Sequence, residues 1–144
     1  MVELKKIDRN NLDDILSLSV RDDQRELVCS NAESIAQAYA QQECIPLAVY
    51  AGDSPVGFLM YCLDWDENEY WLYRLMIDAR YQGRGYGRQA LEQVLERVRH
   101  NRARHRIFLG VDRAGVASLA LYQSVGFRFD GREYGKERIM VFEW

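Results

Sequence analysis

A glycine-rich hexapeptide at residues 82–87, Gln-Gly-Arg-Gly-Tyr-Gly, lies between an apolar run at 71–77 that favours a β-strand and an amphipathic run that favours a helix. Glycine has no Cβ, so its backbone can turn sharply and come close to a ligand. The first N–H groups of the following helix have no partner within the helix and can face an anion. Arg84 and Arg88 add positive charge to this turn. The placement predicts a phosphate-binding turn, and hence a nucleotide cofactor.

The spacing of these glycines distinguishes between the known phosphate-binding loops. A P-loop ends in Gly-Lys-Ser or Gly-Lys-Thr, which does not occur in the chain. A Rossmann fingerprint counted from Gly83 would need a third glycine where Arg88 stands. Two interpretations are left: a Gln-x-x-Gly-x-Gly pyrophosphate loop, or an ordinary surface turn before a helix.

Composition places the chain among ordinary globular domains, with 48% hydrophobic residues, 28% charged residues and a net charge of -3. We expect a single domain over residues 1–144. Three widely spaced cysteines, Cys29, Cys44 and Cys62, indicate small core side chains in a reducing compartment rather than disulfides. The first residues lack the apolar stretch of a signal peptide, and no run approaches the roughly 18 apolar residues of a membrane span. These features predict a cytoplasmic protein that does not contact a membrane.

Hydrophobic periodicity predicts that strands and helices alternate along the chain. Strands are expected at residues 2–7, 45–51, 56–63, 69–77, 106–111, 127–130 and 138–144, and helices at 12–19, 34–42, 90–98 and 118–125. Turn residues at 52–55 indicate a hairpin, and Gly126 is a candidate left-handed cap for the last helix. The pattern predicts an α+β fold with a mixed, mostly antiparallel sheet of about seven strands flanked by about four helices.

This element order, with a glycine turn between the fourth strand and the third helix, resembles the GNAT superfamily of acyl-CoA-dependent N-acyltransferases over nearly the whole chain. Residues 72–87 run in the order typical of that family, and residues 121–127 are similar to its Leu-Tyr-x-x-x-Gly-Phe segment. Within the superfamily, residues 73–87, 126–129 and 138–141 most resemble bacterial spermine/spermidine (diamine) acetyltransferases. The resemblance implies the GNAT fold and an acetyl-CoA-dependent N-acetyltransferase.

The resemblance also implies a division of labour among the site residues. The pyrophosphate of acetyl-CoA would lie over Gln82, Gly83, Arg84, Gly85, Tyr86, Gly87 and Arg88. The pantetheine arm would pair with the backbone of Leu75, Met76 and Ile77, and the N–H near Ile77 is the expected donor to the thioester oxygen. No metal is expected, since His100 and His105 lack further ligands at suitable spacing.

Tyr122 is the candidate general acid that protonates the leaving CoA thiolate. A phenol with a reference pKa of about 10 stays protonated at neutral pH and can donate to a thiolate whose reference value is about 8.5. The alternative is a helix tyrosine that only packs against the core. In the family an Asn commonly opens the last helix at the position of Gly115, which places cofactor affinity in question. Glycine can still cap that helix, and Ser118 is a candidate to replace part of the lost contact.

Glu69, at the start of the strand that ends in Ile77, is the first candidate for the general base, with an exposed hairpin residue as the alternative. Strict alternation along this strand would place Glu69, Trp71, Tyr73 and Leu75 on one face and Tyr70, Leu72, Arg74 and Met76 on the other. A β-bulge would change this parity.

Charge patterning bears on the acceptor. Carboxylates and aromatic residues gather near the proposed active strand and in the helical region that commonly covers the acceptor site in this family: Asp64, Trp65, Asp66, Glu67, Glu69, Tyr70, Asp22, Asp23 and Glu26. They would attract a small cationic amine, or they are a solvated hairpin tip. The basic run at 97–106 complements a helix C-terminus and lacks interleaved aromatic residues, so we expect a solvated face and no nucleic-acid partner.

Three hypotheses follow from these patterns. The first is an acetyltransferase that acts on a polyamine or diamine. The second is a GNAT enzyme for an amino acid, an antibiotic or a protein N-terminus. The third, motivated by Gly115, is a non-catalytic acyl-CoA-binding module. Phe142 and Trp144 belong either to a homodimer interface or to the packing of the final strand.

Overall fold

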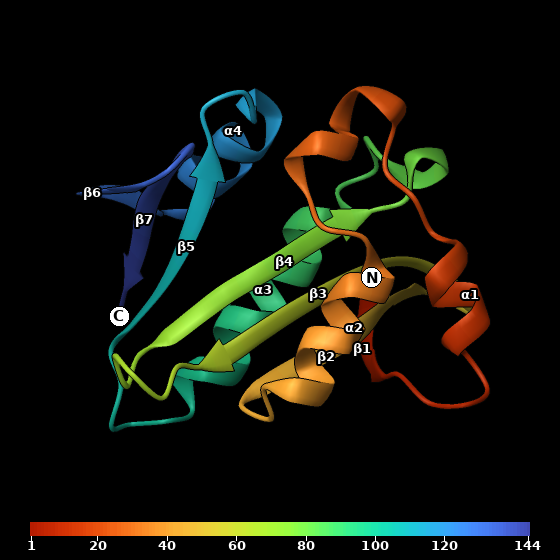
Figure 1. Cartoon of the computed structure of the whole chain (residues 1–144), viewed down its shortest axis with the longest axis horizontal. Helices are drawn as coiled ribbons and strands as arrows, with labels where there is room; N and C mark the ends of the chain where they lie inside the picture. Colours follow the sequence, from red (N-terminus) through yellow and green to blue (C-terminus); the bar gives the residue numbers. More distant parts are fainter.

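A seven-stranded mixed sheet organises residues 1–144 in the computed structural model (Figure 1). The strands are β1 (Val2–Lys6), β2 (Cys44–Ala51), β3 (Ser54–Leu63), β4 (Tyr70–Ile77), β5 (Arg106–Asp112), β6 (Arg128–Tyr134) and β7 (Glu137–Glu143). They are ordered β1-β2-β3-β4-β5-β7-β6, and β4 and β5 are the one parallel pair. The structure confirms the predicted α+β class and the largely antiparallel sheet.

Four α-helices and two short 3-10 helices cover the sheet unevenly (Figure 1). The helices are α1 (Leu12–Ser17), η1 (Asp22–Leu27), α2 (Asn31–Ala40), η2 (Ala79–Tyr81), α3 (Tyr86–Arg99) and α4 (Val116–Val125). Side chains of α3 and α4 pack on one face, while those of α1 and α2 pack on the other face over β2, β3 and β4. On that second face, Phe108 of β5 and Ile139 and Val141 of β7 form a small separate cluster with no helical residue. This part of the sheet is called the helix-free face below.

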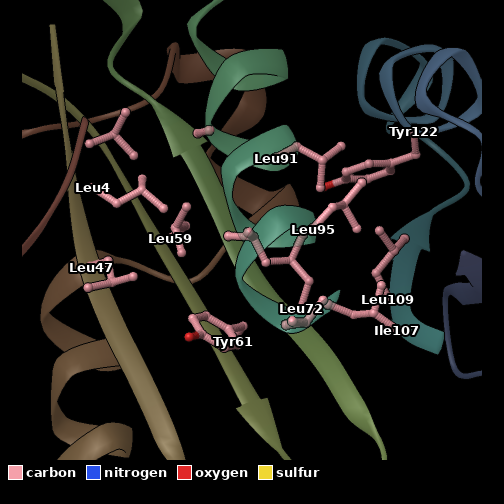
Figure 2. Packing of buried hydrophobic residues seen from close by; sticks show 14 of the residues in the cluster. Leu4, Leu47, Leu59, Tyr61, Leu72, Leu91, Leu95, Ile107, Leu109 and Tyr122 are labelled. Carbon is pink, nitrogen blue, oxygen red and sulfur yellow. The ribbon is translucent and has the colours of Figure 1, made fainter. Parts of the chain in front are cut away.

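The main core forms where α3 lies along the sheet (Figure 2). The predicted apolar stripe of this helix is buried: Ala90, Leu91, Val94, Leu95 and Val98. Leu91 and Leu95 belong to the same cluster as strand side chains such as Leu72 and Leu109 (Figure 2). Phe142 and Trp144 pack against the same cluster, so the final strand contributes to the core. This packing fixes the end of α3 that follows the glycine turn.

β4 and β5 separate after a short parallel pairing. Only residues Tyr70, Trp71 and Leu72 of β4 pair with β5, opposite Ile107, Phe108 and Leu109. Beyond that point the two strands diverge (Figure 1), so residues 73–77 of β4 and 110–112 of β5 have no partner across the gap. The split leaves backbone N–H and C=O groups that an extended ligand can pair with.

A β-bulge in β4 changes which side chains face which layer. Met60 of β3 pairs with Arg74 and Tyr61 pairs with Leu72, so Tyr73 is the extra residue. Tyr73 still faces the α1 and α2 layer, and Arg74 also binds there, donating to Ser34 and Gln37 of α2. Leu75 packs on the α3 side instead. The predicted alternation is therefore wrong beyond Tyr73, and the bulge is the reason.

Several other predicted details differ from the structure. α2 begins at Asn31, because Ser30 and Glu33 form a reciprocal capping box at its start. The strand predicted at 127–130 continues to Tyr134, with a register irregularity around Gly131. Cys44 and Cys62 are buried as expected, but Cys29 is exposed, so the expectation of a core role is wrong there. None of the helices has the length and apolar character needed to cross a membrane.

Candidate active site

A cleft of about 780 Å³ opens at the split between β4 and β5. Its walls are the end of β4, the glycine turn, the start of α4 and the segment that leads into and through η1. The lining includes Leu75, Met76, Ile77, Gln82, Gly83, Gly85, Tyr86, Gly87, Arg88, Gly115, Ser118 and Tyr122. The structure thus brings together all but two of the sequence-predicted site residues, the exceptions being Arg84 and Glu69.

The glycine turn has the conformation that its sequence requires. Gly83 and Gly85 have φ angles of 79° and 82°, a region that residues with a Cβ rarely adopt. Gly85 is the N-cap of α3 and supplies no side chain, so the first N–H groups of this helix remain available at the edge of the cleft. Such an N-terminus attracts anions. The turn therefore offers a site for a phosphate group.

Asp78 anchors the chain between β4 and the glycine turn. Its carboxylate is 3% exposed and accepts from the N–H of Ser19 at 2.9 Å, the N–H of Arg80 at 2.9 Å and Nε of Arg80 at 2.8 Å. Burial alone would raise the pKa of Asp78, but the hydrogen bonds from Arg80 and Ser19 outweigh it and hold the pKa below its usual value. The turn is thereby tied to the segment that follows α1.

Gln82 also connects β4, the glycine turn and the segment that follows α1. Its Nε2 donates to the carbonyl of Ile77 at 2.9 Å and to Oε1 of Gln24 in η1 at 2.9 Å. The residue therefore fixes the exit of β4 against the glycine turn and holds η1 at the cleft. Residues 20–28 form a further wall of the cleft, and no motif in them predicts a role in the cofactor site.

Alternate backbone N–H groups at the end of β4 point toward β3 and toward the split. The N–H of Asp78 donates to the carbonyl of Val56 in β3 at 2.8 Å. Because neighbouring residues of a strand point their N–H groups in opposite directions, the N–H of Ile77 faces away from β3 and toward the split. This is the position expected for a donor to an oxyanion.

Tyr122 lies between α4 and α3, with its side chain directed toward Leu91 (Figure 2). It is 8% exposed, lines the cleft and packs against Phe127 with a ring separation of 5.9 Å. Its carbonyl accepts from the N–H groups of Gly126 and Phe127 at 3.2 and 3.0 Å, and Gly126 ends the helix with a φ of 121°. The Gly-Phe pair thus turns the chain back beneath the tyrosine ring, which explains why these residue types follow Tyr122.

Burial is the main cause that raises the pKa of Tyr122 to about 12, and the negative charge of Glu137 adds to it. The phenol therefore keeps its proton through the whole neutral range. A protonated phenol on a residue that lines the cleft is suited to donate to a thiolate and unsuited to act as a base.

Gly115 is the N-cap of α4, as predicted, and no side chain caps the helix there. A Cβ at this position would lie 3.1 Å from the carbonyl oxygen of Asp112, so the turn is closed tightly around the glycine. The carboxylate of Asp112 accepts from the N–H of Ala114 at 2.8 Å and holds the loop. The start of α4 is therefore formed without the Asn that the family pattern favours.

The two predicted arginines of the turn differ in placement. Arg88 lines the cleft, where Nη1 donates to Ser124 at 2.7 Å and Nε to Glu92 at 3.1 Å. Arg84 lies outside the lining, with its guanidinium 5.6 Å from the centre of the Tyr81 ring. Arg88 is thus the arginine held at the cleft.

Glu69 lies away from the cleft, in a second cavity of about 620 Å³ on the helix-free face. It is bound to Nε of Arg106 at 3.0 Å. Glu67 and Asp130 share Arg132, and Glu143 binds Arg128. This cavity is called the charged cavity below. The structure does not bring Glu69 to the other site residues, and it pairs much of the acidic cluster with arginines.

Comparison with known proteins identifies the family of the chain. The family model of the GNAT acetyltransferases matches residues 12–127. Spermine/spermidine N(1)-acetyltransferase of Bacillus subtilis (strain 168) is 30% identical over 149 residues, covering 99% of this chain and 98% of that protein.

Two solved structures share the fold. An acetyltransferase from Thermus thermophilus has a TM-score of 0.80 at 21% identity, over 100% of this chain and 97% of that one. Spermidine N-acetyltransferase from Vibrio cholerae, in complex with CoA and spermine, has a TM-score of 0.77 at 17% identity, over 99% of this chain and 95% of that one. Since the family model spans most of the chain and the Bacillus relative aligns with it from end to end, the chain belongs to the GNAT family and is an acetyl-CoA-dependent N-acetyltransferase.

Proposed function

We propose that this enzyme transfers the acetyl group of acetyl-CoA to a primary amine of a polyamine or diamine by direct attack. The observation that carries the proposal is the split between β4 and β5, where the free backbone of β4 and the hydroxyl-bearing ring of Tyr122 line the same cleft. An extended pantetheine arm pairs with Leu75, Met76 and Ile77 as a further strand would. The pyrophosphate lies over the glycine turn and the start of α3.

The reaction then needs only groups that line the cleft. The neutral amine attacks the thioester carbon, and the carbonyl oxygen becomes an oxyanion that accepts from the N–H near Ile77. The C–S bond breaks as the tetrahedral intermediate collapses, and the thiolate takes a proton from the Tyr122 hydroxyl. The nitrogen of the new amide gives up its extra proton through water, which restores the phenol. One further proton is released to solvent when the acceptor ammonium becomes a neutral amine.

The polyamine acceptor is supported by sequence similarity along the full chain to a protein named for spermine and spermidine acetylation. The chain is also 40% identical over 60 residues to an N-alpha-acetyltransferase from Mycobacterium tuberculosis, but that match covers only 42% of this chain. A relative that aligns over all elements is the better guide to the acceptor, because the acceptor site draws on residues outside the cofactor motifs.

The test is release of the CoA thiol from acetyl-CoA with a panel of amines: spermine, spermidine, short diamines, amino acids, an aminoglycoside and a peptide N-terminus. Turnover confined to the polyamines and diamines is the expected result. Turnover on another class would overturn the acceptor assignment and leave the cofactor site intact. Binding of acetyl-CoA without turnover on any amine would favour the non-catalytic module.

A further inference from the structure

We propose that Glu137, at the start of β7, binds a second ammonium group of the acceptor while the neighbouring amine attacks the thioester. The inference rests on the proposed polyamine or diamine function, and it assigns to one carboxylate the ability to distinguish a diamine from a monoamine.

The position of Glu137 is set by a glycine in β5. A Cβ on Gly110 would lie 3.0 Å from Cδ and Oε1 of Glu137 and 3.1 Å from Oε2. All three carboxyl atoms are thus about equally close to that position, so the carboxylate lies over the bare backbone of β5. Gly110 directly follows Leu109, the last residue of β5 that pairs with β4. The carboxylate is therefore held at the point where the split begins.

This carboxylate also lies on the accessible side of the sheet. Leu109 and Val111 of β5 are buried in the core under α3, so Gly110 between them faces the helix-free side. Glu137 shares this face with Ile139 and Val141, which follow it at strand spacing along β7. An acceptor can approach the split over this face while the cofactor occupies the cleft.

Two carboxylates of this face have no cationic partner, Glu137 and Asp112, which lies opposite it on β5; Asp112 instead accepts from the N–H of Ala114. Glu69 binds Arg106, Asp130 binds Arg132, and Glu143 binds Arg128. Glu133, on the neighbouring strand of the same hairpin, binds Arg113. Arg138, next in sequence, lies 4.3 Å from the centre of the Phe129 ring and makes no ion pair with Glu137. A free carboxylate at the split is available to a cation that the chain itself does not supply.

The negative charge of Glu137 also acts on Tyr122. It contributes to the raised pKa of Tyr122, after burial, so the two groups are electrostatically coupled across β5. Adjacent nitrogens of a polyamine are separated by a few methylene groups. An acceptor whose attacking nitrogen lies at the split can place its next nitrogen over Gly110 beside Glu137, whereas a monoamine leaves Glu137 unpaired.

The experiment compares kcat/KM for a diamine and for a monoamine of equal chain length, in the full-length enzyme and three variants. We expect the wild type to prefer the diamine by about fivefold, the upper end of the range for exposed ion pairs. Glu137→Gln removes the charge and should bring this ratio close to one. Gly110→Ala should lower the ratio by displacing the carboxylate. Glu133→Gln is the matched control and should keep the wild-type ratio.

The KM for acetyl-CoA and the kcat distinguish a loss of acceptor binding from a general loss of activity. In Glu137→Gln the KM for acetyl-CoA should match the wild type, and in Glu133→Gln the kcat with saturating monoamine should match it as well. If both Glu137→Gln and Gly110→Ala keep the wild-type preference for the diamine, the proposed role of Glu137 is overturned, while the proposed polyamine or diamine function still stands. An equal loss in Glu133→Gln would also overturn it, because the effect would then follow net charge. A wild type that turns over other amines but no diamine or polyamine would overturn the proposed acceptor itself.

Discussion

The cleft at the split and the charged cavity are lined by different kinds of groups. The cleft at the split is lined mainly by backbone, glycines and apolar side chains, with Tyr122 as its buried hydroxyl. The charged cavity is lined by carboxylates and arginines that bind one another, among them Glu69 with Arg106 and Asp130 with Arg132. Most charged groups of this second cavity are already paired with one another, although Oε2 of Glu69 has no hydrogen-bond partner. The cleft therefore offers groups for binding and catalysis, whereas the charged cavity mainly joins the strands.

The comparison also changes the interpretation of the acidic cluster. As a sequence, residues 64–69 place carboxylates beside aromatic residues at the start of the active strand. In the fold, Glu67 binds Arg132 and accepts from Nε1 of Trp71 at 3.0 Å, and Asp64 accepts from the N–H of Glu67 at 2.7 Å. Much of the local negative charge is thus used internally. The variants below test this contrast, from the cleft to the charged cavity.

Tyr122→Phe should have the largest effect, because it removes the acid from the cleft and leaves the ring packing in place. We expect kcat to fall roughly 10²- to 10³-fold, within the usual range for general acid catalysis, with both KM values little changed. Steady-state rates with a polyamine measure this. Tyr134→Phe, at an exposed tyrosine of β6, is the control.

The pH profile provides a second measurement on the same residue. Because the pKa of Tyr122 is raised to about 12, the phenol stays protonated well above neutral pH. The rate should therefore rise with pH as the acceptor amine loses its proton, with no decline from Tyr122 below about pH 11. A descending limb between pH 8 and 10 that disappears in Tyr122→Phe would contradict this assignment.

Asp78→Asn should have the next largest effect, here on stability. The pKa of the carboxylate is lowered in the folded state, so its contribution is present above the unfolded pKa of about 4 and is lost as pH falls through the folded value. We expect a loss of roughly 2 kcal/mol at neutral pH, measured by urea unfolding, since a buried set of charge-assisted hydrogen bonds is weakened.

The same variant should also flatten the dependence of stability on pH below about 5. Asp53→Asn, in the exposed turn between β2 and β3, is the control and should unfold like the wild type. If both variants lose the same stability, the anchoring of the glycine turn through Asp78 is not a major contribution.

Gln82→Ala tests whether the cleft depends on the link between β4, the glycine turn and η1. The variant loses the hydrogen bonds to Ile77 and Gln24, so the turn and the η1 wall are less well positioned. We expect the KM for acetyl-CoA to rise about tenfold, with a smaller change in kcat. Gln42→Ala, at an exposed position before β2, is the matched control. A KM within a factor of two of the wild type would remove Gln82 from the cofactor site.

The parts of the fold that could be predicted from sequence are those with local causes. Gly83, Gly85 and Gly126 need positive φ angles, and the apolar stripe of α3 repeats at helical spacing, so the turn, the cap and the core helix are all evident in the sequence. The family resemblance then places Tyr122 and the backbone of β4.

What could not be predicted depends on contacts between distant segments. The bulge at Tyr73 follows from the pairing of β3 with β4, and the wall at residues 20–28 follows from contacts with Gln82 and Asp78. Glu69 appeared suitable as a base until the fold placed Arg106 beside it. Glu137 carried no motif at all, because its position depends on the absence of a side chain at Gly110 in another strand.

Arg132→Ala should have the smallest effect and is the strictest test of the contrast between the cavities. The guanidinium binds Asp130 and Glu67 and lies 4.7 Å from the centre of the Phe108 ring, yet its side chain is 34% exposed. Pairs at such positions typically contribute about 1 kcal/mol or less, so thermal unfolding should shift only slightly. The kcat and the polyamine KM should stay within a factor of two of the wild type, because the charged cavity supports the strands and does not hold the acceptor. A polyamine KM that falls severalfold when Asp130 and Glu67 lose their partner would show instead that the acceptor extends into this cavity, and that its arginines limit how tightly a polycation binds.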